Sequence, residues 1–277
     1  CCVLITGYSM ETIQVFVLAL IQGLTEYLPI SSSAHLILPS HLLGWPDQGL
    51  AFDVAVHIGS LLAVCTYFRQ ELQIIITSCW EQLCGGGGDE HSRLGWLLIW
   101  GTIPVGLAGL LFDDFIESHL RSIMVIALTT IIFGLLLGLV DKKGAQQLSM
   151  AQMNWRSATL IGLSQALALI PGTSRSGVTI TAALALGYDR QSAARFSFLL
   201  AIPVIILSGG YKGLQLVGVS SSVAWGDIFL GIAISATTAF ACIHFFLALV
   251  NRIGMMPFVW YRLILGGYLC TLLVNGS

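Results

Sequence analysis

The chain has 277 residues, of which 56% are hydrophobic and only 9% are Asp, Glu, Lys or Arg. A soluble domain carries about 25% charged residues, so too few charges are present to cover a water-dissolved globule of this size. The composition therefore predicts a polytopic membrane protein and excludes soluble enzymes and secreted disulfide modules. The formal net charge of −2 gives no sign of a clustered basic face, and we expect no nucleic acid among the partners.

The first residue is not Met, and Met10 would make a natural start. We therefore expect residues 1–9 to be an N-terminal extension that contributes nothing to function.

Six segments are apolar over about 20 residues, the length that a helix needs to cross a bilayer. They are residues 52–69, 94–112, 121–140, 192–211, 226–250 and 257–274. These segments predict an all-α membrane fold.

Two further apolar stretches, residues 13–43 and 157–187, are interrupted near their middles. Pro29 with Ser31–Ser33 breaks the first stretch, and Pro171–Ser174 breaks the second. We expect each stretch to form two half-helices that make a re-entrant hairpin. Unpaired backbone at membrane depth is tolerated only where protein or a water-filled cavity surrounds it, so function should be sought at the breaks.

The basic residues between spans fall mostly on one face, if each broken stretch enters and leaves the membrane on the same side. That face holds Arg69, Arg93, Lys142, Lys143, Arg156, Arg190, Arg195 and Arg252. The positive-inside rule makes this face cytoplasmic, which places both termini and the mouth of the first hairpin outside. The second hairpin then opens to the cytoplasm.

This layout predicts an inverted-topology repeat, in which each half is a broken hairpin followed by about three transmembrane helices. The first repeat would cover residues 10–140 and the second residues 157–277, joined by a cytoplasmic hinge at residues 141–156. In such folds the two broken hairpins meet near the bilayer midplane, where ligands bind.

Gln22 and Glu26 are four residues apart and share one face of a half-helix. A carboxylate buried in a membrane is costly and usually functional. One carboxylate with an amide partner suits a loosely held hard cation that also touches phosphate oxygens. We therefore expect Glu26 and Gln22 to bind a divalent cation, Mg²⁺ or Ca²⁺; the alternative is that Glu26 lies shallow in the interface or caps a neighbouring helix.

Ser31–Ser33 offer hydroxyls that can cap the second half-helix, whose first turn carries His35. Ser32 and His35 are three residues apart and can face one ligand. A hydroxyl beside an imidazole suits nucleophilic attack or protonation of a leaving group. The alternative is that the serines only cap and that His35 makes a structural hydrogen bond. His57 and His244, isolated in later spans, are expected to be structural.

Residues 171–179, PGTSRSGVT, place a guanidinium and several hydroxyls at the start of a half-helix. The free amides and the positive dipole end of such a helix attract anions, and an arginine fork suits phosphate. Glycines there let the backbone approach closely. The anion contacts are expected from Ser174, Arg175, Ser176, Gly177 and Thr179. The alternative, an arginine that snorkels from a helix end, leaves the hydroxyls and glycines unexplained.

Together these residues predict a phosphate site within the membrane, and apolar walls reachable from lipid make a phosphorylated lipid the natural ligand. The pattern resembles the BacA/UppP family of undecaprenyl pyrophosphate phosphatases. The resemblance extends from Met10 onward and rests on QGLTEYLPISSSAH at residues 22–35 and PGTSRSGVT at residues 171–179. Many members of this family have Glu where the chain has Gln22. This difference argues against a metal site with two carboxylates and leaves Glu26 as the main expected ligand.

The resemblance implies a multi-pass enzyme of the bacterial inner membrane with its active site facing the periplasm. It would hydrolyse undecaprenyl pyrophosphate to undecaprenyl phosphate and inorganic phosphate and so recycle the cell-wall carrier lipid. Ser32, or a water in its place, would attack while His35 exchanges the proton, and Arg175 with a cation near Glu26 would neutralise charge. Substrate contacts are expected from Gln22, Ser31, Ser33, Ser174, Ser176, Gly177 and Thr179.

The main alternative is a transporter or flippase for a phosphorylated prenyl lipid, since inverted repeats with broken helices are a transporter architecture. A third hypothesis is that the protein only binds the lipid. The sequence leaves open the nucleophile, the choice between Mg²⁺ and Ca²⁺, the prenyl chain length and whether a homodimer forms.

Overall fold

The computed structural model describes residues 10–216 and 224–275, and over these ranges the regular elements are helices. In chain order they are α1 (Thr12–Thr25), α2 (Ser32–Leu43), α3 (Gly49–Tyr67), α4 (Arg69–Leu83), α5 (Glu90–His119), α6 (Ile123–Lys143), η1 (Met150–Gln152), α7 (Trp155–Ala166), η2 (Leu167–Leu169), α8 (Arg175–Ala185), α9 (Arg190–Leu216), α10 (Trp225–Ile253) and α11 (Met256–Asn275). The two η elements are single 3₁₀ turns. The predicted all-α fold is confirmed, whereas the extension expected at residues 1–9 lies outside the described residues.

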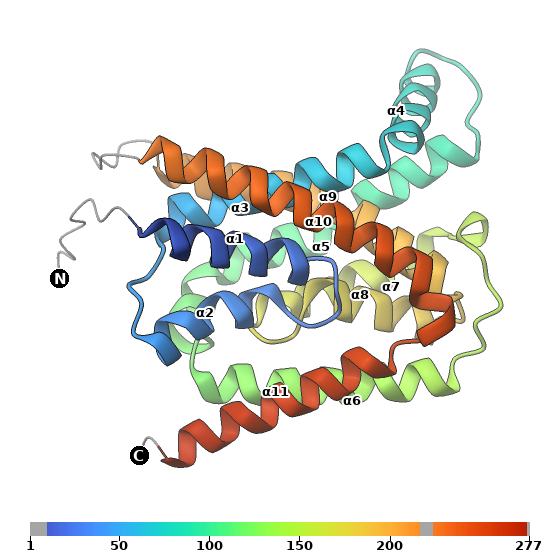
Figure 1. The fold of residues 1–277 in the computed structure, drawn as a ribbon. Coiled ribbons are helices and arrows are strands. Elements are labelled where there is room, and N and C mark those ends of the chain that lie inside the picture. The colour runs from blue at the N-terminus through green and yellow to red at the C-terminus, as the bar shows by residue number, and fades with distance from the viewer. Residues whose placement is uncertain (1–9, 217–223, 276–277) are drawn as a thin grey trace.

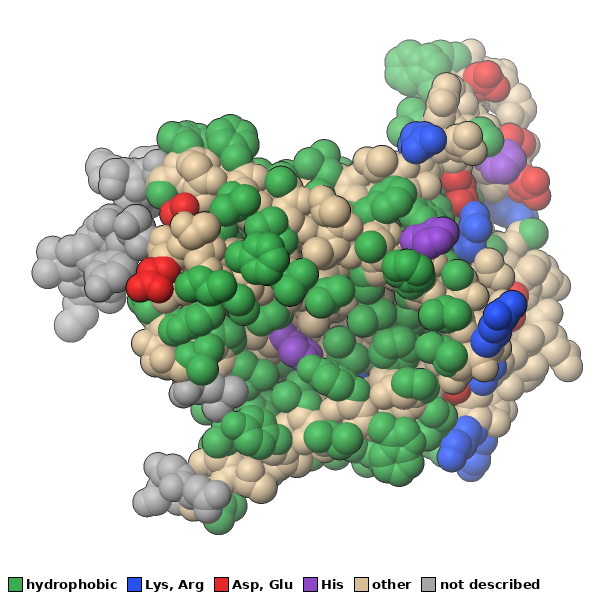
Figure 2. All heavy atoms as spheres, in the orientation of Figure 1, with side chains coloured by type: hydrophobic (Ala, Val, Ile, Leu, Met, Phe, Trp, Pro, Cys, Tyr) green, Lys and Arg blue, Asp and Glu red, His purple; other side chains and the backbone are tan. Residues whose placement is uncertain are grey.

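Six of these helices, α3, α5, α6, α9, α10 and α11, are long and apolar enough to cross a membrane. They coincide with the six predicted spans, so the chain is a multi-pass membrane protein. Large apolar side chains cover much of the outer surface along the helices (Figure 2). A helix that faces lipid has this kind of surface, because lipid tails are as apolar as the side chains that meet them.

Each broken stretch folds back on itself as a pair of half-helices (Figure 1). The pair α1 and α2 enters from the end of the bundle where α11 finishes, and the pair α7 and α8 enters from the opposite end. On the face shown in Figure 2, the Lys and Arg side chains gather at the end where α7 begins. The two hairpins therefore reach the interior from opposite ends of the molecule.

Glycines allow the closest contacts between helices. A Cβ atom placed on Gly23 of α1 would lie 1.8 Å from Thr238 Oγ1 in α10, and one placed on Gly162 of α7 would lie 2.5 Å from Gly101 O in α5. Membrane helices associate through such small residues, because burial of apolar surface supplies no driving force in lipid. The first half-helix of each hairpin is therefore held against a long membrane-spanning helix.

Helix α4 is an element that the apolar runs of the sequence do not predict. It extends from the bundle at the basic end (Figure 1). Cys79 of α4 donates to Ser92 O at the start of α5 over 3.5 Å, and Glu71 pairs with Arg195 of α9 at 2.6 Å. The segment is too polar to qualify as a span, so a search for membrane-length apolar runs passes over it.

Replacing Gly162 with Ala is expected to lower the free energy of unfolding by about 1–3 kcal/mol, because the added methyl group has no room against the backbone of α5. The Tm of the purified protein in detergent measures the effect. Gly267→Ala is the matched control, because a Cβ atom there meets nothing within 4 Å and alanine favours a helix. Equal Tm values for the two variants would contradict the close contact between α5 and α7.

Candidate active site

The first break lies between α1 and α2 and ends at Ser31. This residue has φ 74° and ψ 95°, a conformation that L-residues rarely adopt. Its hydroxyl accepts a hydrogen bond from Ala34 N at 3.5 Å and so caps α2. Ser31 is buried, and the break therefore ends in a helix N-terminus inside the protein.

The second break lies between η2 and α8 and has the same backbone design. Ser174 has φ 73° and ψ 115°, and its hydroxyl accepts from Gly177 N at 3.1 Å. Gly172 has φ 88°, and a Cβ atom there would lie 2.3 Å from Thr129 Oγ1, so only glycine fits. Backbone conformations of this kind persist only where the surroundings fix them, and they cluster at functional sites.

A buried ion pair joins the two hairpins. Arg175 Nη2 donates to Glu26 Oε1 over 2.9 Å, and the two side chains are 12% and 7% exposed. Arg175 Nη1 donates to Ser197 O at 3.1 Å. Ser176 Oγ donates to Leu28 O at 2.8 Å. The first break therefore lies directly against the first turn of α8.

The second carboxylate oxygen of Glu26 is surrounded by donors. Gln22 Nε2 and Ser32 Oγ each donate to Oε2 over 2.9 Å. The structure therefore brings together four of the predicted residues: Gln22, Glu26, Ser32 and Arg175. A hydroxyl that already donates to a carboxylate can transfer its proton there as its oxygen attacks.

His57 of α3 belongs to the same cluster, although its isolation in the sequence predicts a structural role. Its Nε2 lies 3.7 Å from Glu26 Oε2. Its Nδ1 lies 2.7 Å from Asp53 O; because a carbonyl only accepts, Nδ1 carries a proton and Nε2 is the nitrogen that faces Glu26. The signal that could have identified His57 is that an ionisable side chain within a span is functional by default.

His35 is hydrogen-bonded elsewhere. Its Nδ1 lies 2.6 Å from Ser31 O, its Nε2 contacts the Tyr261 hydroxyl, and its ring stacks on that of Tyr261. Neither ring nitrogen contacts Ser32 in the structure. The pairing of Ser32 with His35 that the spacing suggests therefore stays a prediction.

The remaining predicted residues line the two breaks. Ser33 is exposed and its Oγ lies 3.2 Å from that of Ser31. Thr179 Oγ1 exchanges a hydrogen bond of 2.7 Å with Ser197 Oγ. Gly177 leaves room for Arg262, whose Nη1 would lie 2.9 Å from a Cβ atom at that position. Contacts of these residues with a ligand stay predictions.

The oxygen atoms of Glu26 and Gln22 suit a hard cation that also takes ligands from other molecules. Gln22 Oε1 is buried and has no hydrogen-bond partner among the described residues, so an amide oxygen stands beside the carboxylate. Within residues 10–216 and 224–275, no group of three or more His, Cys, Asp or Glu side chains could hold a metal ion. The Gln22 amide oxygen and the Glu26 carboxylate would offer two oxygen ligands, a number that suits an ion that takes its other ligands from water and phosphate, as Mg²⁺ commonly does.

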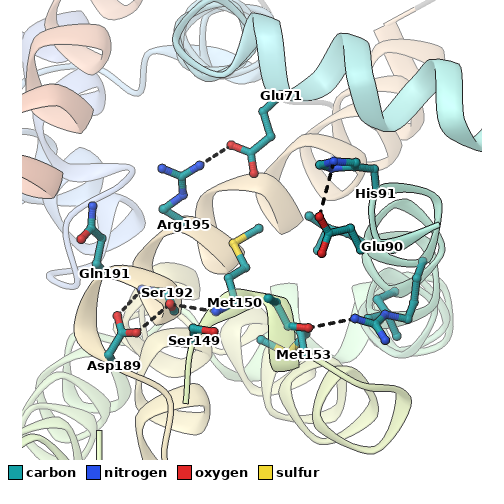
Figure 3. A pocket seen from close by; sticks show the side chains of 14 residues that line it. Glu71, Glu90, His91, Ser149, Met150, Met153, Asp189, Gln191, Ser192 and Arg195 are labelled. Carbon is teal, nitrogen blue, oxygen red and sulfur yellow. Dashed lines mark hydrogen bonds and ion pairs between the residues drawn. The ribbon is translucent and has the colours of Figure 1, made fainter. Parts of the chain in front are cut away.

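A separate cavity of about 410 Å³ lies at the basic end of the molecule (Figure 3). Its charged groups satisfy one another or neighbouring backbone: Arg195 pairs with Glu71 at 2.6 Å, Arg93 donates to Ala151 O at 2.8 Å, and Asp189 accepts from Ser192. None of the predicted site residues lines it. The contacts between the two hairpins therefore define the candidate active site.

The family model of Bacitracin resistance protein BacA matches residues 15–268, which include both hairpin breaks. The chain belongs to the BacA family. It is 63% identical to the undecaprenyl-diphosphatase of Teredinibacter turnerae over 257 residues, which are 93% of this chain and 97% of that protein. It is also 57% identical to the undecaprenyl-diphosphatase of Saccharophagus degradans, over 95% of this chain and 98% of that protein. The family resemblance inferred from the two BacA motifs is confirmed.

The ion pair between Glu26 and Arg175 is expected to show strong coupling in a double-mutant cycle. Glu26→Gln or Arg175→Gln alone leaves one buried charge unpaired, which costs about 3–5 kcal/mol. The double variant is expected to cost less than the sum of the two single changes. Denaturant unfolding in mixed micelles measures these free energies.

The matched control is Lys212→Gln, because Lys212 pairs with Asp113 at 3.3 Å and the two side chains are 31% and 29% exposed. This change is expected to cost about 1 kcal/mol or less. Strictly additive effects of Glu26→Gln and Arg175→Gln would show that the two charges do not interact.

Proposed function

We propose that the chain hydrolyses undecaprenyl pyrophosphate to undecaprenyl phosphate and inorganic phosphate. The observation that carries this proposal is the pair of contacts made by the Glu26 carboxylate. Oε2 accepts from the Ser32 hydroxyl, and Oε1 accepts from Arg175 of the other hairpin. A nucleophile, its base and a phosphate-binding guanidinium are thereby in contact inside a membrane protein. The names of the BacA relatives, undecaprenyl-diphosphatases at 56–63% identity, support the same reaction.

We infer that residues 10–140 and 157–277 are inverted repeats joined by a hinge at residues 141–156. The shared backbone geometry of Ser31 and Ser174 supports this inference, as does the entry of the two hairpins from opposite ends. If the basic end lies on the cytoplasmic side of a bacterial inner membrane, the first hairpin opens to the periplasm. The lipid tail stays among the membrane lipids while the diphosphate reaches the site from that side.

The diphosphate would bind between the N-termini of α2 and α8. Ser31 and Ser174 cap one amide each at these ends, and the other first-turn amides with the partial positive charge of the helix end would attract an anion. Arg175 adds a fork of donors whose geometry matches phosphate. These groups stabilise the negative charge that develops on the oxygens of the terminal phosphoryl group.

The reacting groups would be Ser32 and Glu26. As the Ser32 oxygen forms a bond to the terminal phosphorus, its proton passes to Glu26 over the 2.9 Å contact. The bond from that phosphorus to the bridging oxygen breaks, and undecaprenyl phosphate leaves with the electron pair. A water oxygen then bonds to the phosphorus of the phosphoserine as the bond to the Ser32 oxygen breaks; Glu26 returns its proton to that oxygen, and the water's protons leave with inorganic phosphate. A water that attacks in place of Ser32 gives the same products. The contact favours Glu26 over His35 as the group that accepts the proton.

We also propose a divalent cation, Mg²⁺ or Ca²⁺, which Glu26 and Gln22 would hold. When bound, it supplies positive charge to the phosphoryl oxygens.

Release of phosphate from undecaprenyl pyrophosphate by the purified protein tests the proposed reaction. Arg175→Ala and Glu26→Ala are each expected to lower kcat/KM by about 100-fold or more, because each removes a group that stabilises the transition state. Lys212→Ala is the control, since this residue lies in the ion pair with Asp113 and away from the cluster. Full turnover by both site variants would refute the assignment of the site.

The same assay separates hydrolysis from transport and tests the cation. A wild-type protein that binds the lipid or moves it across a bilayer, yet releases no phosphate, would favour a transporter over an enzyme. Removal of divalent cations by a chelator is expected to abolish turnover, and added Mg²⁺ or Ca²⁺ to restore it. Turnover that is indifferent to the chelator would exclude an essential cation at Glu26.

A further inference from the structure

Arg262 of α11 is the largest fully buried side chain among the described residues, with 0% of its surface exposed. It is also the charged residue of a helix that is otherwise uncharged. No ion pair with a carboxylate is found for it within the described ranges, although it lies inside a membrane-spanning segment. A buried charge without a carboxylate partner is costly and therefore calls for a physical reason.

The guanidinium of Arg262 donates to carbonyl groups of both hairpin breaks. Nη1 donates to Pro29 O of the first break at 3.1 Å, and Nη2 donates to Gly172 O at 2.9 Å and Thr173 O at 3.0 Å in the second break. Nε donates to Thr130 O of α6 at 3.0 Å. One planar group thus connects the two breaks with the neighbouring helix.

The carbonyls at the breaks need these donors. Where a helix stops inside a membrane, its last carbonyls lose their helical partners, and an unsatisfied carbonyl at that depth costs several kcal/mol. Arginine offers five N–H donors in a rigid plane, whereas lysine offers three on a single nitrogen. Helix α6 adds two more donors, since Thr129 Oγ1 bonds Pro171 O at 2.7 Å and Thr130 Oγ1 bonds Gly172 O at 3.3 Å.

Arg262 also lies immediately beside the first turn of α8. Its Nη1 would be 2.9 Å from a Cβ atom on Gly177, and Gly177 is two residues after Arg175. A shift of the guanidinium would move the two breaks relative to each other. The ion pair of Arg175 with Glu26 spans those breaks, so it depends on their relative position.

We propose that Arg262 is a positioning residue that fixes the two breaks against each other and so holds Ser32 and Glu26 in register with Arg175. It acts through the backbone carbonyls and does not touch the substrate. The effect on turnover rests on the proposed phosphatase function, whereas the effect on the breaks does not.

The test compares Arg262→Lys and Arg262→Met with the wild type in two measurements on folded protein in detergent. The first is hydrogen–deuterium exchange of the backbone amides in residues 27–33 and 171–177. The second is the kcat and KM for release of phosphate from undecaprenyl pyrophosphate. Arg252→Lys and Arg252→Met are the matched controls, because Arg252 is exposed in the last turn of α10.

Both Arg262 variants are expected to speed exchange at the two breaks together. A displacement of about 1 Å can cost 100-fold in rate, so kcat is expected to fall by about 100-fold in Arg262→Met, with a smaller change in KM. Arg262→Lys is expected to recover part of kcat because it keeps the charge and some donors. The Arg252 variants are expected to match the wild type in both measurements.

Wild-type exchange at both breaks together with a wild-type kcat in Arg262→Met would overturn the proposal. So would a change confined to KM, which indicates a distant charge and not a positioning group. If the wild-type protein releases no phosphate, the proposed function fails while the exchange measurement still decides the role of Arg262.

Thr129→Val is the milder variant, should the Arg262 variants not fold. It removes the hydroxyl that bonds Pro171 O and is expected to speed exchange at residues 171–177 alone. Unchanged exchange at residues 171–177 would show that the carbonyls of the second break do not need donors from α6 and α11. It would overturn the proposal as well.

Discussion

The need to satisfy backbone groups away from water determines how this protein builds its centre. A helix that stops in the middle of a membrane exposes carbonyls and amides that lipid cannot satisfy. Here Arg262 of α11 donates to carbonyls of both breaks, and Thr129 of α6 donates to the second. Ser31 and Ser174 each cap one amide at the starts of α2 and α8. Carbonyl groups at the breaks thus face protein donors, and the N-termini of α2 and α8 lie near Glu26 and Arg175.

The ion pair of Glu26 with Arg175 is possible because of this arrangement. Each charge alone would be costly at this depth, and their contact offsets part of that cost. Gln22, Ser32 and His57 surround the same carboxylate, so its orientation is fixed from three helices. A reactive group that is held in this way needs little rearrangement when charge develops in the reaction.

Much of the fold and the centre of the site could be predicted from the sequence. The spans follow from the lengths of the apolar runs, and the breaks follow from Pro29 and Pro171 within such runs. The contact of Glu26 with Arg175 follows from the expectation that two broken hairpins meet. Arg262 and His57 could not be assigned in this way, because a single ionisable residue in an apolar span shows that a partner exists but not which one. Their partners lie far away along the chain and are brought close only by the packing of α11 and α3.

The ion pair of Glu26 with Arg175 also bears on how a reaction cycle would end. Glu26 occupies one edge of the Arg175 guanidinium, so any anion must compete with an internal carboxylate. A diphosphate carries more charge than a monophosphate and competes better. The carboxylate would thus regain the arginine once the diphosphate has been cleaved, which favours release of the less charged products and resets the site.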